Sequence, residues 1–159
     1  MGIIGIDVGA KGSLCHLNDS GRLITILPFA LDIYVCYLKS LESIPIVIVE
    51  EVHSMPRQGV KSMFSFGTRF GEIIGILSAL GIPYTLLKPK QWQSSFKFEF
   101  DVKNEFSKEA LAEVGISLYT AKFPDEVLPI YKKNGKIDTD KSDSLMIAMS
   151  QILGKYSRG

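Results

Sequence analysis

The sequence predicts an α/β fold in which a five-stranded mixed sheet carries helices on both faces. Three short apolar runs near the N-terminus are separated by turn residues, as in a meander of antiparallel strands. The rest of the chain alternates between helical and strand patterns, which favours parallel pairing. Residues 44–49 form a nearly continuous β-branched run, which is typical of a strand buried on both faces.

Each strand is placed by its apolar pattern and its flanking turns. The five strands are expected at residues 3–8, 13–17, 23–27, 44–49 and 84–87. Turn residues at 18–21 predict a hairpin between the second and third strands. Asp7 lies near the end of the first strand and Glu50 directly follows the fourth. The two acids become neighbours if these strands pair in parallel.

Helices are expected at residues 32–41, 61–80, 103–114 and 140–153. The second is the longest and is followed by Gly81 and Pro83, which are typical of a helix end. A poorly patterned stretch at 121–139 precedes the last helix. The chain has 159 residues, 46% of them apolar, and neither a repeat nor a linker. We therefore expect one compact domain over residues 1–159.

The net charge of +1 excludes a globally basic nucleic-acid binder, but the charge is unevenly distributed. Residues 1–55 hold three bases and six acids, residues 56–104 seven bases and three acids, and residues 105–159 eight of each. The acidic positions and the basic segment are therefore separate. An acidic centre beside a local basic surface suits a polyanionic substrate held by its flanks.

The cysteines and the hydropathy pattern predict the compartment. Cys15 and Cys36 are far apart in apolar surroundings and lack metal-site spacing, so we expect both to be buried and reduced. No signal-peptide pattern opens the chain, and no stretch approaches the roughly 18 apolar residues of a membrane span. We therefore expect a soluble, cytoplasmic protein.

Four acidic residues stand at the ends of predicted elements: Asp7, Glu50, Asp140 and Asp143. A carboxylate beside a buried apolar run is unfavourable unless it is paired, hydrogen-bonded or bound to a metal. Asp140 and Asp143 are three residues apart and face the same way from one helical turn. If the fold brings the acids together, a hard divalent cation relieves their repulsion, as in two-metal phosphodiester hydrolysis.

Three of the four acids also have a simpler interpretation. Asp7 suits a turn, the neighbours Glu50 and Glu51 suit a solvated strand end, and Asp140 suits the first turn of a helix. Their joint arrangement, two strand ends and a helix start, favours the metal site. Whether Glu51 or Asp138 assists that site stays open.

Other motifs favour structural roles. Lys11 lacks the flanking residues that a Walker A loop requires, His16 lies on a predicted strand, and Trp92 suits the core. Glycines recur at every fourth residue of the long helix: Gly67, Gly71 and Gly75. Two interpretations of them stay open, namely close packing on the protein's own sheet and a dimer interface.

Basic and aromatic residues gather on segments that follow predicted strand ends, where ligands bind in open α/β sheets. They are Arg57, Lys61, Arg69, Lys88, Lys90, Trp92, Lys97 and Lys103. A solvated face explains lysines in general, but this clustering favours contacts with phosphates.

Three segments carry a family resemblance: residues 5–12 around Asp7, residues 49–67 after Glu50, and residues 140–148, with a weaker fourth at 89–92. They resemble the RuvC-type Holliday junction resolvases of the RNase H-like superfamily, particularly their small phage-encoded branch. The resemblance spans nearly the whole chain. It implies an RNase H-like fold and a homodimer that nicks four-way junctions and other branched DNA, such as flaps. A phage-encoded protein would act in the host cytoplasm.

The resemblance also implies the functional residues. Asp7, Glu50, Asp140 and Asp143 match the four metal-binding acids of the family, which hold two Mg²⁺ ions, with Mn²⁺ as a substitute. His53 stands where the family's resolvases can place an aromatic side chain that opens the junction, so this chain departs from the family there. The expected DNA-binding residues are His53, Arg57, Lys61, Lys88, Lys97 and Lys103.

Parts of the sequence also suit other functions. A small enzyme type of the same superfamily has the same acids and acts on structured RNA such as ribosomal RNA precursors. The start at residues 5–9 also resembles the phosphate loops of actin-like proteins and sugar kinases, but 159 residues leave no room for a second nucleotide-binding half. Intact acids at all four positions argue against a binding module without catalysis.

Overall fold

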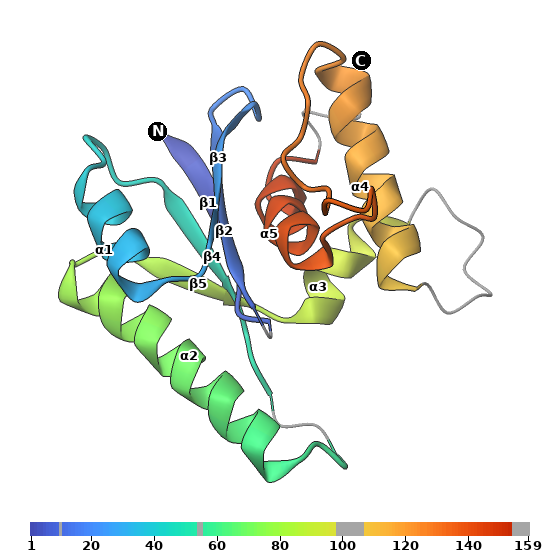
Figure 1. Cartoon of the computed structure of the whole chain (residues 1–159). Coiled ribbons are helices and arrows are strands. Elements are labelled where there is room, and N and C mark those ends of the chain that lie inside the picture. Colours follow the sequence, from blue (N-terminus) through green and yellow to red (C-terminus); the bar gives the residue numbers. More distant parts are fainter. Residues whose placement is uncertain (10, 54–55, 98–106, 154–159) are drawn as a thin grey trace.

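The computed structural model describes residues 1–9, 11–53, 56–97 and 107–153. The strands are β1 (Gly2–Asp7), β2 (Ser13–Asn18), β3 (Leu23–Pro28), β4 (Ile46–Glu50) and β5 (Tyr84–Leu87). The helices are α1 (Leu31–Lys39), α2 (Val60–Ala79), α3 (Pro89–Ser94), α4 (Lys108–Lys122) and α5 (Thr139–Ser150). Figure 1 shows them as three layers, with the sheet in the middle.

The strands form one sheet in the order β3-β2-β1-β4-β5. The meander β1-β2-β3 is antiparallel, whereas β4 pairs in parallel with both β1 and β5. This arrangement confirms the predicted five-stranded mixed sheet. Because β1 is central and pairs with β4, the ends of these two strands meet at one edge of the sheet.

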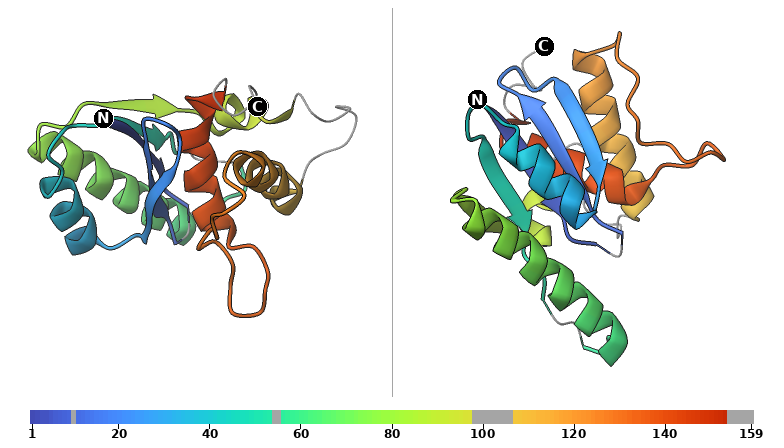
Figure 2. Two further views of the ribbon diagram at one scale, coloured as in Figure 1. Left: turned by 90° about the horizontal axis from the view of Figure 1, so that it is seen from above. Right: turned by 60° about the vertical axis from the view of Figure 1, so that its left-hand side comes forward.

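Alternation along the strands divides the core in two. Ile4 and Ile6 face the layer of α1 and α2, while Ile3 faces the layer of α3, α4 and α5. Figures 1 and 2 show the two helix layers on opposite faces of the sheet. Odd-numbered positions of β1 therefore point toward α5, and Asp7 is one of them.

Helix α5 approaches β1 so closely that there is no room for a side chain at Gly5. A Cβ built on Gly5 would lie 2.4 Å from the carbonyl oxygen of Ser144 and 2.5 Å from the backbone nitrogen of Ala148. Glycine at this position, opposite two small residues, therefore sets the distance between α5 and the sheet. Residues 142–149 of α5 are all buried, as expected for a helix between a sheet and a second helix, α4.

Several element boundaries differ from the sequence prediction. Strand β4 begins at Ile46 and not at residue 44, because Pro45 has no N–H to donate to a strand ladder. Helix α4 extends to Lys122, well beyond the predicted end at residue 114, and begins after Ser107, whose hydroxyl accepts a hydrogen bond from the backbone of Ala110 at 3.1 Å. The predicted helical residues 103–106 lie outside the described residues. The short helix α3 was not predicted.

The prediction of two buried cysteines is half wrong. Cys15 is fully buried on β2, and burial raises the pKa of its thiol. Cys36 is exposed, because α1 turns Tyr34 and Leu38 toward the sheet and Cys36 lies between them in sequence, on the outer side of the helix. The prediction of a cytoplasmic protein assumed that both cysteines are buried, and only Cys15 meets this assumption.

None of the helices within the described residues combines the length and the hydrophobicity needed to cross a lipid bilayer.

Candidate active site

The strand register brings Asp7 and Glu50 together. Ile6 of β1 is paired with Val49 of β4, so the next residue of each strand is an acid at the same edge of the sheet. Both acids occupy positions that point to the α5 side. Asp7 is only 3% exposed, and its Oδ1 accepts a hydrogen bond of 2.9 Å from the backbone N–H of Gly9.

The first turns of α5 supply the other two acids. Helix α5 begins next to the start of β2, where the Ser13 hydroxyl donates to the carbonyl of Asp140 at 2.6 Å and hydrogen-bonds the Ser144 hydroxyl at 2.7 Å. These buried contacts fix Asp140 beside the loop that follows β1. Asp143 lies one helical turn further on and is buried as well. Three segments far apart in sequence thus deliver the four predicted acids to one place.

The carboxylates influence one another electrostatically. Burial raises the pKa of Asp7 well above its ordinary value, and the negative charges of Glu50, Asp143 and Asp140 raise it further, against the hydrogen bond from Gly9. Burial likewise raises the pKa of Asp143 from 3.8 to about 7; the charge of Lys108 opposes this shift, while Glu50 and Asp140 add to it. The site therefore has an unfavourable excess of negative charge.

Glu50 is held in place by a residue of the short helix α3. Trp92 on α3 is buried, and its Nε1 donates a hydrogen bond of 2.8 Å to Glu50 Oε2. Burial raises the pKa of Glu50, and this hydrogen bond and the charge of Lys108 lower it in return. The prediction that Trp92 belongs to the core is confirmed, and the indole also orients an acid of the site.

Two basic residues border the acids. Lys108, at the start of α4, places its Nζ 3.9 Å from Asp143 Oδ2, and its own side chain is largely exposed. Arg69 on α2 donates to the carbonyl of Gly9 at 2.7 Å and lies over the ring of Phe29. Lys108 thus offers a positive charge at the mouth of the site, while Arg69 holds the loop after β1 from the other face of the sheet.

Sequence patterns contain no signal for the roles of Lys108 and Trp92. Lys108 lies 35 residues before Asp143, and Trp92 lies 42 residues after Glu50. Neither pair is linked by a local motif. The packing of α3 and α4 around α5 creates both contacts.

The donor atoms of the site fit a hard divalent cation. Carboxylate oxygens are the ligands that Mg²⁺ and Mn²⁺ prefer. A Cβ on Gly9 would lie 3.0 Å from Asp7 Oδ2 and 3.3 Å from Asp140 Oδ1, so glycine leaves space between these two acids. Within the described residues, no group of three or more His, Cys, Asp or Glu side chains is arranged so that it could hold an ion. The four acids therefore form an electrostatic cluster and not a preformed chelate.

Two further acids near the site, Glu51 and Asp138, lie in different surroundings. Glu51 Oε2 lies 3.5 Å from His53 Nε2. Asp138 occupies the N-cap position of α5, where its side chain makes no capping hydrogen bond. His16 is buried on β2 with its Nδ1 2.7 Å from the Tyr37 hydroxyl, a contact in keeping with the structural role expected for it.

The six predicted DNA-binding residues fall in separate places. His53, Arg57 and Lys61 are exposed on the connection from β4 to α2 and on the first turn of α2. Lys88 is exposed directly after Leu87, the β5 partner of Glu50, so it lies at the same edge of the sheet as the acids. Lys97 is half-buried after α3, and Lys103 lies outside the described residues.

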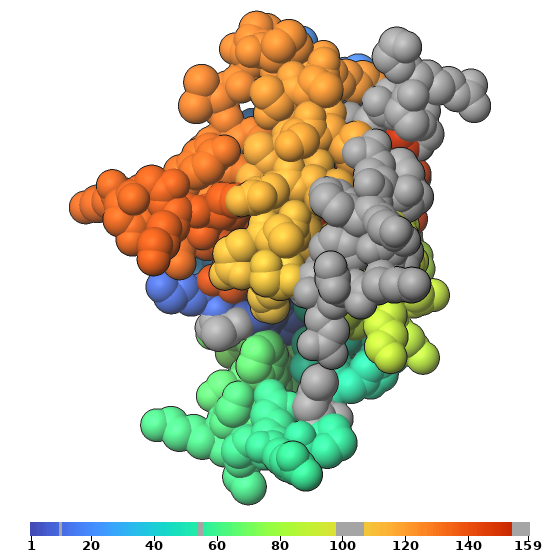
Figure 3. All heavy atoms as spheres, turned by 90° about the vertical axis from the view of Figure 1, so that its right-hand side faces the viewer, coloured from blue at the N-terminus to red at the C-terminus, as the bar shows by residue number. Residues whose placement is uncertain are grey.

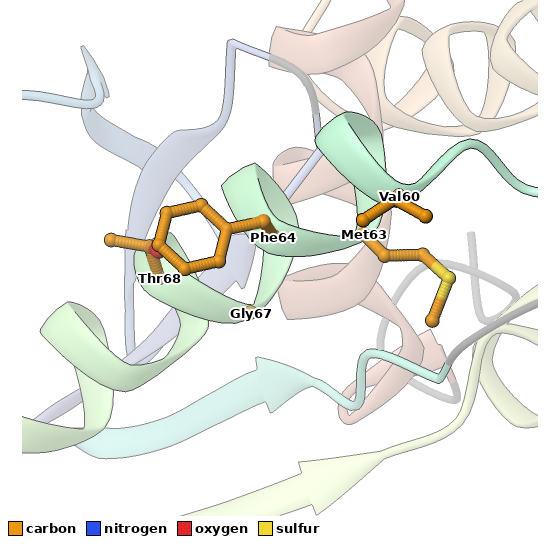
Figure 4. A pocket seen from close by; sticks show the side chains of 5 residues that line it. All are labelled: Val60, Met63, Phe64, Gly67 and Thr68. Carbon is orange, nitrogen blue, oxygen red and sulfur yellow. The ribbon is translucent and has the colours of Figure 1, made fainter.

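The first turns of α2 carry an exposed apolar surface. Val60 is 85% and Phe64 76% exposed, and Figure 4 shows them with Met63 and Thr68 around a shallow hollow beside Gly67. Three glycines of α2 do not pack on the sheet, because a Cβ on any of them would meet no described atom within 4 Å: Gly67, Gly71 and Gly75. Packing on the protein's own sheet, one of the two interpretations of these glycines, is therefore wrong.

The sheet order and the helices on both faces are those of the RNase H-like fold. Two solved structures of RuvC share it over nearly the whole chain. The structure of "T. thermophilus RuvC in complex with Holliday junction substrate" has a TM-score of 0.65 and 18% identity, covering 99% of this chain and 96% of that one. A second Thermus thermophilus RuvC structure has a TM-score of 0.61 and 16% identity, with coverage of 99% and 97%.

The structural similarity has no counterpart in sequence comparisons. No family model and no curated protein sequence matches the chain. At these identities the comparison establishes the fold alone.

Proposed function

We propose that this protein is a metal-dependent endonuclease that cleaves four-way junctions and other branched DNA. One observation carries the proposal: Asp7, Glu50, Asp140 and Asp143 come from three segments and converge where the ends of β1 and β4 meet the start of α5. The raised pKa values of Asp7, Glu50 and Asp143 favour a cation at this place. The shared fold adds support, because the similar RuvC structure contains a Holliday junction.

The four acids would hold two Mg²⁺ ions, or Mn²⁺ in their place. Asp7 is the most buried of them and is electrostatically coupled to the other three, so it would be the central acid of the set that holds the metal. When bound, such a metal pair activates the attacking water and neutralises charge on the departing 3′ oxygen. No protein nucleophile is needed, and the products carry 5′-phosphate and 3′-hydroxyl ends.

The chain's own residues prepare the site for this chemistry. The indole of Trp92 fixes the direction of Glu50, and Arg69 fixes the loop next to Asp7. Lys108 is largely exposed and places its Nζ 3.9 Å from Asp143 Oδ2, so its charge can reduce the repulsion between the acids and the substrate. These contacts limit the reorganisation needed before reaction.

We further propose that two copies of the chain associate through the apolar surface of α2. A four-way junction offers related strands to two active sites, which suits a two-fold symmetric dimer. Val60 and Phe64 supply exposed apolar area, and the glycines that follow allow a partner's backbone to approach closely. The DNA arms would be held by His53, Arg57, Lys61, Lys88, Lys97 and Lys103.

A cleavage assay with Mg²⁺ on four labelled substrates tests the proposed function. The substrates are a four-way DNA junction, a DNA flap, linear duplex DNA and a structured RNA. We expect cleavage of the two branched DNAs and little of the duplex. Cleavage of the RNA alone would assign the chain to the alternative, a ribonuclease with the same acids. No cleavage of any substrate by a folded, dimeric sample would contradict the nuclease assignment.

A further inference from the structure

The poorly patterned stretch before α5 contains an ordered hairpin, which we call the lysine hairpin (residues 130–138). Its tip is a tight turn closed by two backbone hydrogen bonds: Lys132 N–H donates to the carbonyl of Lys136 at 2.8 Å, and Gly135 N–H donates to the carbonyl of Lys132 at 2.9 Å. Gly135 has a φ of 80°, a conformation that favours glycine. The turn therefore has a defined shape.

The base of the hairpin is fixed to the body of the protein. The backbone N–H of Asp138 donates to the carbonyl of Ile130 at 2.7 Å, and Tyr131 and Ile137 form an antiparallel bridge next to it. Ile130 is fully buried in the core on the α5 side of the sheet. A tip on such a base is held in place and does not sample space as a free loop would.

The tip is strongly basic. Lys132, Lys133 and Lys136 are all exposed, and no acidic residue occurs between residues 127 and 137. In the part of the chain that the structure describes, no ion pair within 4 Å involves these three lysines. Figure 2 shows the hairpin, coloured orange, projecting from the body, and Figure 3 shows it as a protrusion on one side.

The hairpin leads directly into the acidic centre. Its last residue, Asp138, is the N-cap of α5, and its carbonyl accepts a hydrogen bond of 3.0 Å from the backbone N–H of Ser142. Lys136 precedes Asp140 by only four residues. An acidic centre repels a phosphodiester backbone unless cationic groups nearby attract it, and the lysine hairpin carries three such groups on the segment that leads into the site.

We propose that the lysine hairpin binds the phosphate backbone of a duplex DNA arm next to the bond that is cleaved. The inference rests on the proposed function and adds a contact surface on the α5 side of the acids. Lysine offers a compact point charge and not the planar fork with which arginine reads bases. The hairpin therefore positions the substrate and carries no sequence preference. In Figure 3, residues of the N-terminal segment lie between this protrusion and the lobe formed by the start of α2.

Binding of a labelled four-way DNA junction across a salt titration, without divalent cation, tests this inference. The matched pair of variants is Lys133→Gln, at the hairpin tip, and Lys39→Gln, another exposed lysine, which lies on α1 on the opposite face of the sheet. For Lys133→Gln we expect the slope of log affinity against log salt to fall by about 0.9 for each phosphate that the variant no longer neutralises. A variant with all three hairpin lysines changed to Gln should show a larger fall, and the same three changed to Arg should keep the wild-type slope.

The outcomes separate this inference from the proposed function. A lower slope for Lys133→Gln than for Lys39→Gln, with unchanged thermal unfolding, supports the hairpin contact whether or not the wild type cleaves DNA. Equal slopes for these two variants and for the triple Gln variant would overturn the hairpin contact alone. A wild type that binds no DNA would overturn both this inference and the proposed function.

Discussion

Trp92 donates its indole N–H to Glu50 Oε2 at 2.8 Å, and this hydrogen bond joins α3 to the end of β4. Trp92 is the only tryptophan of the chain and is 1% exposed. A buried donor of this kind both orients the carboxylate and favours its charged form. The contact therefore links the packing of an unpredicted helix to an acid of the proposed metal site.

Trp92→Phe tests this link, because phenylalanine keeps an aromatic ring in the core and removes the N–H. We expect Mg²⁺ affinity to fall by about 10- to 100-fold, the usual cost of losing an outer-shell partner of a metal ligand. The maximal cleavage rate at saturating Mg²⁺ should change less. Calorimetric titration with Mn²⁺ measures the affinity independently of cleavage. An unchanged affinity in a stably folded variant would show that the indole does not position Glu50.

The raised pKa of Asp143 makes the free energy of unfolding depend on pH. Burial raises its pKa from 3.8 to about 7, so the folded protein binds this proton more tightly than the unfolded chain does. The contribution of Asp143 to the free energy of unfolding therefore falls as pH rises through this window, by at most about 1.4 kcal/mol per pH unit. Asp143→Asn removes the titration, so without divalent cation the variant should gain stability relative to wild type from pH 4 to pH 7.

Denaturant unfolding at several pH values measures this difference. Addition of Mg²⁺ at pH 8 should stabilise the wild type and have a smaller effect on Asp143→Asn, because a ligand stabilises the folded state only in proportion to its binding. A stability difference that stays constant with pH would show that Asp143 is not held in its protonated form by burial.

The sequence predicted the sheet and the acids because both depend on local patterns. Alternating and β-branched runs marked all five strands, and Asp7 and Glu50 stood at their ends. The order of elements favoured parallel pairing, which makes these acids neighbours, but the register itself comes from the structure. What local patterns could not predict are contacts between distant segments, such as Lys108 with Asp143, which depend on how α4 packs beside α5.

Short polar elements were also missed, for a different reason. The segment that became the lysine hairpin has few apolar residues, so no periodicity marks it, and its shape comes from backbone hydrogen bonds and from one glycine with positive φ. Cys36 was predicted to be buried because its neighbours are apolar. The helix α1 buries only one of its sides, and sequence neighbours on a helix face different directions.

Gly71→Leu tests the dimer. A Cβ at this position meets no described atom within 4 Å, so the leucine should leave the fold of a single chain intact. If a partner helix packs there, the larger side chain forces the two backbones apart and the protein becomes a monomer. Ser78→Leu, which adds the same side chain at an exposed position near the end of α2, is the control. Sedimentation that finds a wild-type monomer at high concentration would remove the dimer.

Cleavage of a four-way DNA junction by Asp7→Asn tests most directly whether the four acids form the proposed metal-dependent catalytic centre. The variant should lose cleavage with Mg²⁺ and bind the junction as well as or better than wild type, because one negative charge near the phosphate is removed. Asp32→Asn, which neutralises an exposed acid on α1, should behave as wild type. Cleavage by Asp7→Asn at the wild-type rate would contradict a catalytic centre built on these four acids.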